Sequence, residues 1–106
     1  SITEAYFKAR GWTLDSLKYP YMGWFDWEGR KYSDLPNILE SFPAFKEHVL
    51  EVMEEEEHSL EIVGYKKGMG VRWKGWEHMK VYSQLVKDLN FLHAAVIAAT
   101  KYWEEK

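Results

Sequence analysis

The chain has 106 residues, with 17 acidic and 14 basic side chains, a formal net charge of −3 and no cysteine. A chain of this length forms a single domain, here residues 1–106, and folding buries about two thirds of its unfolded surface. The absence of cysteine excludes disulfides and thiolate chemistry and suits a reducing compartment, so we expect a cytoplasmic protein. The longest apolar run, Ala94–Ala99, is far shorter than the about 20 residues that span a bilayer, so no membrane partner is expected.

Aromatic residues are frequent, whereas residues of recognisable catalytic motifs are rare. Six Trp, seven Tyr and five Phe make up 17% of the chain, and there are four His. Aromatic side chains supply large areas for burial and also dominate protein interfaces. The composition therefore indicates a protein that packs and binds.

Charge is distributed unevenly along the sequence. Between residues 40 and 61 eight glutamates accompany one lysine, whereas between residues 64 and 87 six basic residues accompany one glutamate. An acidic segment is thus followed by a basic one. Such complementary segments neutralise each other within one chain or support self-association of two copies.

The first expected element is a short amphipathic helix over residues 2–10. Thr3 is the expected N-cap, and Gly11 suits the C-terminal stop. Residues 12–32 show no clean period, so we expect an irregular aromatic segment with a short strand at residues 23–27. Asp34 and Pro36 then predict one or two helical turns through residue 39.

A longer helix is expected from Ser41, which is a suitable N-cap, to about His58. Pro43 fits its first turn. One apolar stripe along this helix would face the core while the glutamates cover the other side. The stripe consists of Phe42, Phe45, Val49, Val52 and Met53.

The period then changes to that of strands at residues 60–66, 69–74 and 78–85, with turns at Lys67-Gly68 and Gly75. Connections this short join antiparallel neighbours, so a three-stranded meander is expected. Asn90 caps a final helix whose alanines permit close approach to the sheet. The predicted fold is α+β: an antiparallel sheet of three or four strands covered by helices, in the order α-(irregular/β)-α-β-β-β-α.

Two short sequence patterns carry a resemblance to a known class of proteins. Gly11-Trp12 follows a short opening helix, and Leu35-Pro36-Asn37 is followed by Leu39, Ala44 and Glu47. Together with the strands and the Ala-rich final helix, this pattern resembles small phage and prophage proteins of the ABA-sandwich type. The resemblance implies a helix–sheet–helix fold and a phage or prophage origin, and it assigns no functional residue.

No catalytic or cofactor motif stands out in the sequence. Glu54 or Glu55 with His58 has helical metal-ligand spacing, but two ligands do not make a site, and a solvated acidic face explains them better. Residues 68–70 lack the Lys-Ser/Thr of a phosphate-binding loop. We therefore expect no catalytic residue, no metal and no cofactor, and an uncharacterised enzyme stays a remote alternative.

The leading functional hypothesis is a non-enzymatic protein that binds a host or phage protein, or a second copy of itself, through an aromatic patch. Trp24, Phe25 and Trp27 are the expected anchors, because exposed aromatic residues dominate binding energy at interfaces. The alternative is that the segment only covers the core.

The second hypothesis is single-stranded nucleic-acid binding by the basic and aromatic hairpin at residues 65–82. Cations displayed between aromatic rings on a sheet can track phosphates and stack bases. The negative net charge and the acidic helix disfavour it. Its expected residues are Arg72, Lys74, Trp76, Lys80 and Tyr82.

Overall fold

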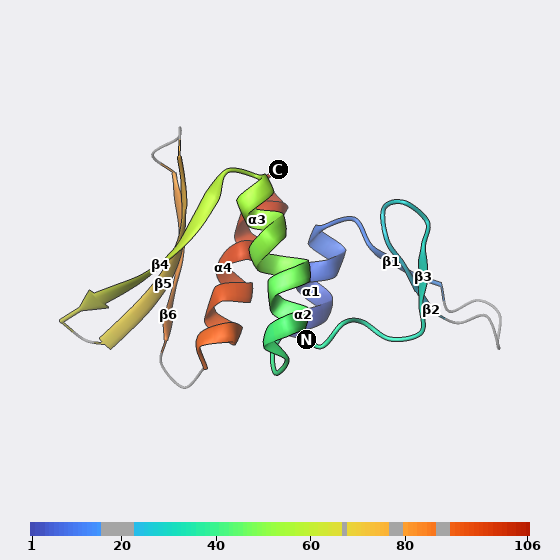
Figure 1. Cartoon of the computed structure of the whole chain (residues 1–106), viewed down its shortest axis with the longest axis horizontal. Helices are drawn as coiled ribbons and strands as arrows, with labels where there is room; N and C mark the ends of the chain where they lie inside the picture. Colours follow the sequence, from blue (N-terminus) through green and yellow to red (C-terminus); the bar gives the residue numbers. More distant parts are fainter. Residues whose placement is uncertain (16–22, 67, 77–79, 87–89) are drawn as a thin grey trace.

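The computed structural model describes residues 1–15, 23–66, 68–76, 80–86 and 90–106. In this part of the chain the helices form a middle layer between two three-stranded antiparallel sheets (Figure 1). The predicted α+β class and the predicted order of elements are confirmed. The elements are α1 (Ile2–Ala9), β1 (Thr13–Asp15), β2 (Gly23–Phe25), β3 (Lys31–Tyr32), α2 (Phe42–Phe45), η1 (Lys46–Leu50), α3 (Glu51–Glu55), β4 (His58–Tyr65), β5 (Gly68–Gly75), β6 (Val81–Val86) and α4 (Phe91–Glu105).

The larger sheet is the predicted meander, with the strand order β4-β5-β6. Trp73 in β5 lies opposite Leu60 in β4 and Tyr82 in β6, so these three side chains share the face that meets the helices. Arg72 and Lys74 alternate with Trp73 and therefore lie on the outer face. No described helix covers that outer face (Figure 1).

Helix α4 packs against the inner face of this sheet and against α1 on its other side. Asn90 caps it as predicted, because its side chain accepts a hydrogen bond from the backbone N–H of His93 at 2.9 Å. The Trp73 indole donates to the carbonyl oxygen of Ala95 at 2.9 Å. Four fully buried alanines let the sheet and α1 approach the helix backbone closely: Ala94, Ala95, Ala98 and Ala99.

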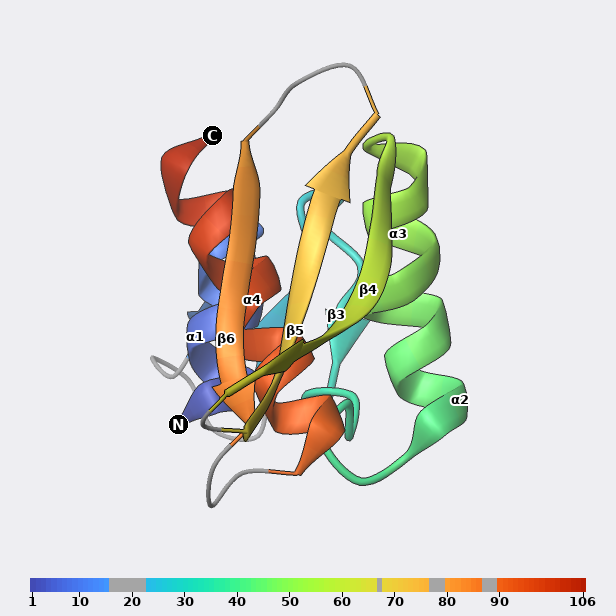
Figure 2. The ribbon, with the colours of Figure 1, turned by 90° about the vertical axis from the view of Figure 1, so that its left-hand side faces the viewer.

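The acidic helix consists of α2, the π-helical segment η1 and α3. Ser41 caps it as predicted by accepting from the backbone N–H of Ala44. It ends at Glu55 and not at His58, because Glu57 adopts a positive φ of 61° that turns the chain into β4. Phe45, Val49 and Met53 are buried as expected, but Phe42 is 57% exposed, since it lies at the first position of the helix beyond the packed surface. Figure 2 shows α3 beside β4 and α4 behind β5 and β6.

Helix α1 spans Ile2–Ala9, close to the predicted residues 2–10. Ser1, and not Thr3, is its N-cap, with the hydroxyl accepting from the backbone N–H of Glu4 at 3.2 Å. Gly11 follows the helix with a φ of 89°, which confirms its role as a stop, because a side chain is disfavoured in this conformation.

The small sheet, in the order β1-β2-β3, lies on the far side of α1 (Figure 1). The predicted strand at residues 23–27 is present as β2, and its two partners were not expected. Its strands have only two or three residues, too few to show a period in the sequence. No helix forms between residues 34 and 39; residues 38–40 make a single turn, and the backbone N–H of Ser41 donates to the carbonyl oxygen of Asn37 at 3.0 Å. Residues 16–22 of the predicted aromatic segment, the predicted turn residue Lys67 and the first two residues of the strand predicted at 78–85 lie outside the described residues.

Among the described helices, none is long and apolar enough to cross a membrane.

The hydrophobic core fills the space where α4, α1, the acidic helix and β5 meet. Its largest fully buried side chains are Trp73, Tyr6, Phe7, Phe45, Ile38 and Met53.

Two tryptophans close together in the sequence should differ sharply in their contribution to stability. Trp73 is fully buried and hydrogen-bonded, whereas Trp76 is 68% exposed. We expect Trp73→Ala to lower the free energy of unfolding by about 3–5 kcal/mol, because it leaves a cavity. Trp76→Ala should change it by less than about 0.5 kcal/mol. Urea denaturation followed by circular dichroism measures both values, and equal losses would contradict this assignment of the core.

Candidate functional site

The candidate site is a groove beside Trp27, a side chain that is 66% exposed. One hollow of about 400 Å³ is shared by segments that are far apart in the sequence. A second hollow of about 190 Å³ has Arg10, Trp27 and Val52 in common with the first, and we call the two together the Trp27 groove. The first is lined by Arg10, Trp27, Val52, Glu55, Glu56 and Trp103; the second adds Trp12, Asp26, Arg30, Tyr32, Glu47 and His48.

A rigid loop between β2 and β3 presents Trp27. The Asp26 carboxylate accepts hydrogen bonds from the backbone N–H groups of Glu28 at 2.9 Å and Arg30 at 2.8 Å. It also accepts from Arg30 Nε at 2.8 Å and from the Tyr32 hydroxyl at 3.2 Å. Gly29 completes the turn with a φ of 83°, a conformation that favours glycine. Trp27 therefore projects from a backbone that is fixed on both sides.

These hydrogen bonds set the ionisation of Asp26. Burial acts to raise the pKa of the carboxyl, but the hydrogen bonds from Arg30 and Glu28 and the charge of Arg30 outweigh burial and hold the pKa below its usual value. The carboxylate is therefore charged at neutral pH, as the loop geometry requires.

Beneath the groove, α1 is tied to the π-helical segment η1. The Tyr6 hydroxyl donates to the carbonyl oxygen of His48 at 2.5 Å, and Arg10 Nη1 donates to the same oxygen at 3.4 Å. The rings of Phe7 and Trp12 meet the His48 ring edge to face, at 5.8 and 6.1 Å between centroids. A π-helical segment of this kind often occurs at a functional site.

The environment of this junction shifts two pKa values. Burial raises the pKa of Tyr6, while Arg10 and Trp103, which lie near its hydroxyl, act to lower it. Burial lowers the pKa of His48, with Glu47 acting to raise it and Arg10 to lower it further. Both side chains are therefore neutral at pH 7, and Tyr6 keeps the proton that it donates to His48.

Arg10 connects the two hollows of the groove. Its guanidinium lies 5.4 Å from the centre of the Trp103 ring, within the range of a cation–π contact. Lys106 lies 5.2 Å from the same ring centre and forms an ion pair with Glu56. Two cations thus lie within cation–π distance of the Trp103 ring at the C-terminal end of α4.

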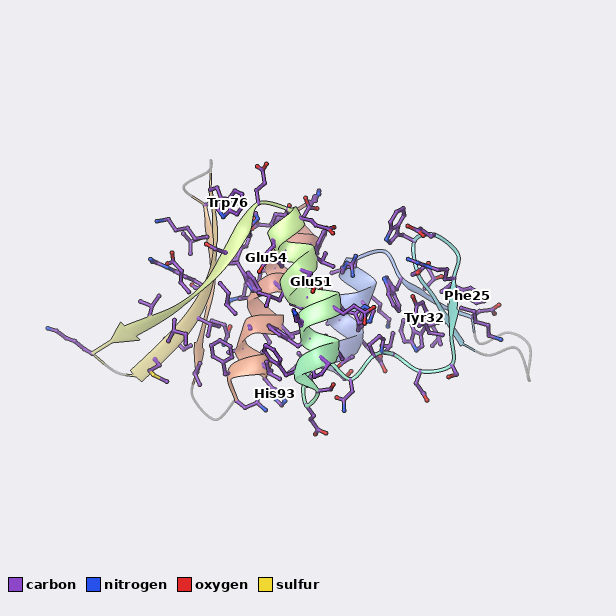
Figure 3. The ribbon with its side chains drawn as sticks, viewed as in Figure 1. Phe25, Tyr32, Glu51, Glu54, Trp76 and His93 are labelled. Atoms are coloured by element: carbon purple, nitrogen blue, oxygen red, sulfur yellow. The ribbon has the colours of Figure 1, made fainter. Side chains whose placement is uncertain are left out.

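The structure separates the three predicted anchors of the aromatic patch. Trp24 is only 7% exposed and belongs to the core, so it is not an anchor of an exposed patch. Phe25, the next residue in β2, is half-buried and points to the opposite face of the strand (Figure 3). Trp27 alone of the three is strongly exposed.

The predicted nucleic-acid residues are also divided between two faces. Arg72 and Lys74 lie on the outer face of the large sheet, whereas Tyr82 lies opposite Trp73 on the inner face and is 9% exposed. The expectation that Tyr82 lies beside the two cations is therefore wrong. Arg72 is paired with Glu61 at 2.6 Å.

The remaining two of these residues lie at the end of the hairpin where β5 leads to β6, close to Lys74, which pairs with Val81. Lys80 is paired with Glu105 at 2.7 Å. Trp76 is 68% exposed and projects at the end of β5 (Figure 3). The five predicted residues therefore do not share one face of the sheet, because Tyr82 faces the helices.

The metal-ligand spacing of Glu54, Glu55 and His58 is not realised on one helix. His58 is the first residue of β4, is 9% exposed and packs against Tyr102, with ring centroids 4.6 Å apart. Its Nδ1 lies 2.8 Å from the carbonyl oxygen of Glu56. The described residues contain no group of three potential metal ligands.

Most of the groove could not be predicted from local sequence patterns. The helical pattern identifies Arg10 only as the end of a helix, and Trp103 only as part of the apolar face of α4. The signal that is present is Arg10-Gly11-Trp12, which joins a cation, a helix stop and an aromatic residue. Comparison with family models, with curated proteins and with solved structures gives no match, so the role of the groove is inferred from its geometry.

The Asp26 loop should lose stability in acid. Because the pKa of Asp26 is lowered in the folded protein, its stabilising contribution is present above the unfolded pKa of about 3.9 and is lost as the pH falls through the folded value. We expect Asp26→Asn to lower the melting temperature at neutral pH, and this deficit to shrink below about pH 4. The exposed Asp34→Asn serves as the control in thermal melts across pH. A deficit that does not change with pH would contradict the prediction.

Proposed function

We propose that this protein is a non-enzymatic binding protein that recognises a protein partner through the Trp27 groove. The observation that carries the proposal is a large aromatic side chain, 66% exposed, on a loop fixed by the Asp26 hydrogen bonds and bordering a groove. Exposed tryptophans that need no reordering on binding are typical interface anchors, because little conformational entropy is lost. The anchor is therefore Trp27 and not the predicted trio.

Electrostatics favour a protein partner over nucleic acid at this groove. Glu47, Glu51 and Glu55 are exposed on the acidic helix, and two of them line the groove. A phosphate backbone would be repelled by these carboxylates. Single-stranded nucleic-acid binding by the outer face of the large sheet stays the alternative, supported only by the exposed Lys74 and Trp76.

The two charged surfaces of the molecule support a defined orientation of the partner. The acidic helix carries Glu51 and Glu54 (Figure 3), whereas the outer face of the large sheet carries Lys74 and Arg72, of which Arg72 is paired with Glu61. Complementary potentials of this kind steer association and suppress wrong orientations. Two copies of the chain could use the same complementarity, so self-association belongs to the same proposal.

We also propose a phage or prophage origin and a cytoplasmic site of action. The resemblance of Gly11-Trp12 and Leu35-Pro36-Asn37 to small phage proteins supports the origin, and the lack of cysteine suits the compartment. The partner is then a host protein or another phage protein.

The test compares two tryptophans of nearly equal exposure. Trp27→Ala should weaken binding of the partner at least about 30-fold, because it removes the anchor. Trp76→Ala, which removes an equally exposed ring outside the groove, should leave binding unchanged. The partner is first obtained by affinity capture from host lysate treated with nuclease, and its affinity for each variant is then measured by calorimetry.

Three results would contradict the proposal. A folded Trp27→Ala variant that binds the partner as tightly as the unchanged protein would exclude the groove as the binding site. Capture that disappears with nuclease, weakens steeply with salt and is lost in Arg72→Ala/Lys74→Ala would favour nucleic acid instead. Retention of concentration-dependent self-association in Trp27→Ala would show that copies of the chain meet elsewhere.

A further inference from the structure

Three hydrogen-bond donors in the wall of the Trp27 groove lack a good acceptor in the described part of the chain: Arg10, Trp12 and Trp103. Arg10 is half-buried, and within the described part of the chain no carboxylate forms an ion pair with it. Its guanidinium makes a long bond of 3.4 Å to the carbonyl oxygen of His48, which already accepts the Tyr6 hydroxyl. A half-buried guanidinium therefore has unused donors at the junction of the two hollows.

Two buried indole N–H groups in the same wall also lack partners. Among the described residues, neither Trp12 Nε1 nor Trp103 Nε1 has a hydrogen-bond acceptor, although both atoms are buried. The Trp103 indole lies near the Tyr6 hydroxyl, but without the geometry of a hydrogen bond. Trp12 is 4% exposed and lines the smaller hollow, and Trp103 lines the larger one. Leaving a buried donor unpaired costs about 1–3 kcal/mol, so such groups call for an explanation.

The buried donors find no acceptor in the groove walls, because two of the four carboxylates are engaged and the other two, Glu47 and Glu55, are exposed to solvent. Asp26 accepts four hydrogen bonds, and Glu56 is paired with Lys106. A ligand that completes the groove must therefore supply acceptor atoms, and a negative charge would compensate Arg10. A carboxylate meets both needs, because it accepts several hydrogen bonds and pairs with guanidinium groups in a fixed geometry.

We propose that the Trp27 groove binds a carboxylate, from an acidic side chain or from the C-terminus of a partner chain, with Arg10 as its counter-ion. This inference rests on the proposed function and specifies which chemical group the partner inserts. The apolar part of the inserted group packs between Trp27 and Trp103, which both line the larger hollow. A hollow of about 400 Å³ has room for one such group.

The surrounding charges select a single carboxylate over a polyanion. Glu47 and Glu55 are exposed at the groove, and Arg30 is already paired with Asp26 and Glu28. One carboxylate directed at Arg10 gains a charge-assisted bond, whereas several phosphates in a row would meet the glutamates.

The test follows the six tryptophan indole resonances by two-dimensional ¹H–¹⁵N NMR while the probe 3-phenylpropionate is added. The indole N–H signals of Trp12 and Trp103 should move downfield as they gain an acceptor. The signal of Trp73, which already donates to Ala95, should stay in place. The neutral amide 3-phenylpropanamide, which has the same shape, should produce much smaller shifts.

Variants of Arg10 test whether its guanidinium is the counter-ion of the bound carboxylate. Arg10→Gln should weaken binding of 3-phenylpropionate at least about tenfold, because a charge-assisted hydrogen bond is lost. Arg10→Lys should recover part of this loss. Lys8→Gln removes a cation from an exposed position on the same helix and serves as the matched control, with unchanged affinity expected.

A second set of probes distinguishes the source of the carboxylate. A short peptide with an internal Asp and an amidated end is compared with a peptide of neutral side chains and a free C-terminus. Larger indole N–H shifts with the Asp peptide would show that the groove binds an acidic side chain. Larger shifts with the peptide that has a free C-terminus would show that it binds a chain terminus.

Three results would overturn the inference. Shifts of equal size with the carboxylate and the amide would show that charge is not recognised, and inorganic phosphate acting as strongly as the carboxylate would show a general anion site. An absence of carboxylate binding in a protein whose partner is still lost through Trp27→Ala would overturn this inference alone and leave the proposed function intact.

Discussion

The double burial of helix α4 is the constraint on which the rest of the structure depends. One side of this helix meets β5 and β6, and the other side meets α1. Only small side chains allow a helix to be approached closely from two directions, which is why the buried alanines concentrate at residues 94–99. The hydrogen bond from the Trp73 indole to Ala95 fixes the helix against the sheet, so the middle layer and the large sheet share one core.

The groove is a consequence of this layering. Because α1 lies against α4, the end of α1 brings Arg10 to the end of α4, where Trp103 is located. The π-helical segment then supplies the carbonyl oxygen of His48 as a common acceptor for Tyr6 and Arg10. The small sheet completes the groove from the other side with Trp27. Each wall of the groove is therefore positioned by an element that also contributes to the core, so the groove has a rigid frame.

The same geometry explains how acidic and basic residues coexist around one groove. Asp26 and Glu56 are engaged by Arg30 and Lys106, so their charges are compensated inside the molecule. Arg10 has no such partner in the described part of the chain, which makes it the cation available to a ligand. The exposed glutamates of the acidic helix produce a negative electrostatic potential around the groove, which limits the anions that can approach it.

Helices and strands could be predicted from the sequence where their caps, stops and side-chain periods lie within a few neighbouring residues. The caps Ser41 and Asn90, the stop at Gly11 and the three-stranded meander follow from hydrogen bonds and side-chain periods within a few residues. The small sheet escaped prediction, because strands of two or three residues show no period and are stabilised only by their neighbours. Strand alternation already separates the buried Trp73 from the exposed Trp76, whereas only the tertiary structure shows that Trp27 and not Trp24 is exposed. The burial of a side chain depends on contacts between segments that are distant in the sequence. The meeting of Arg10, Trp27 and Trp103 depends on such contacts too. Neither can therefore be predicted from a pattern of adjacent residues.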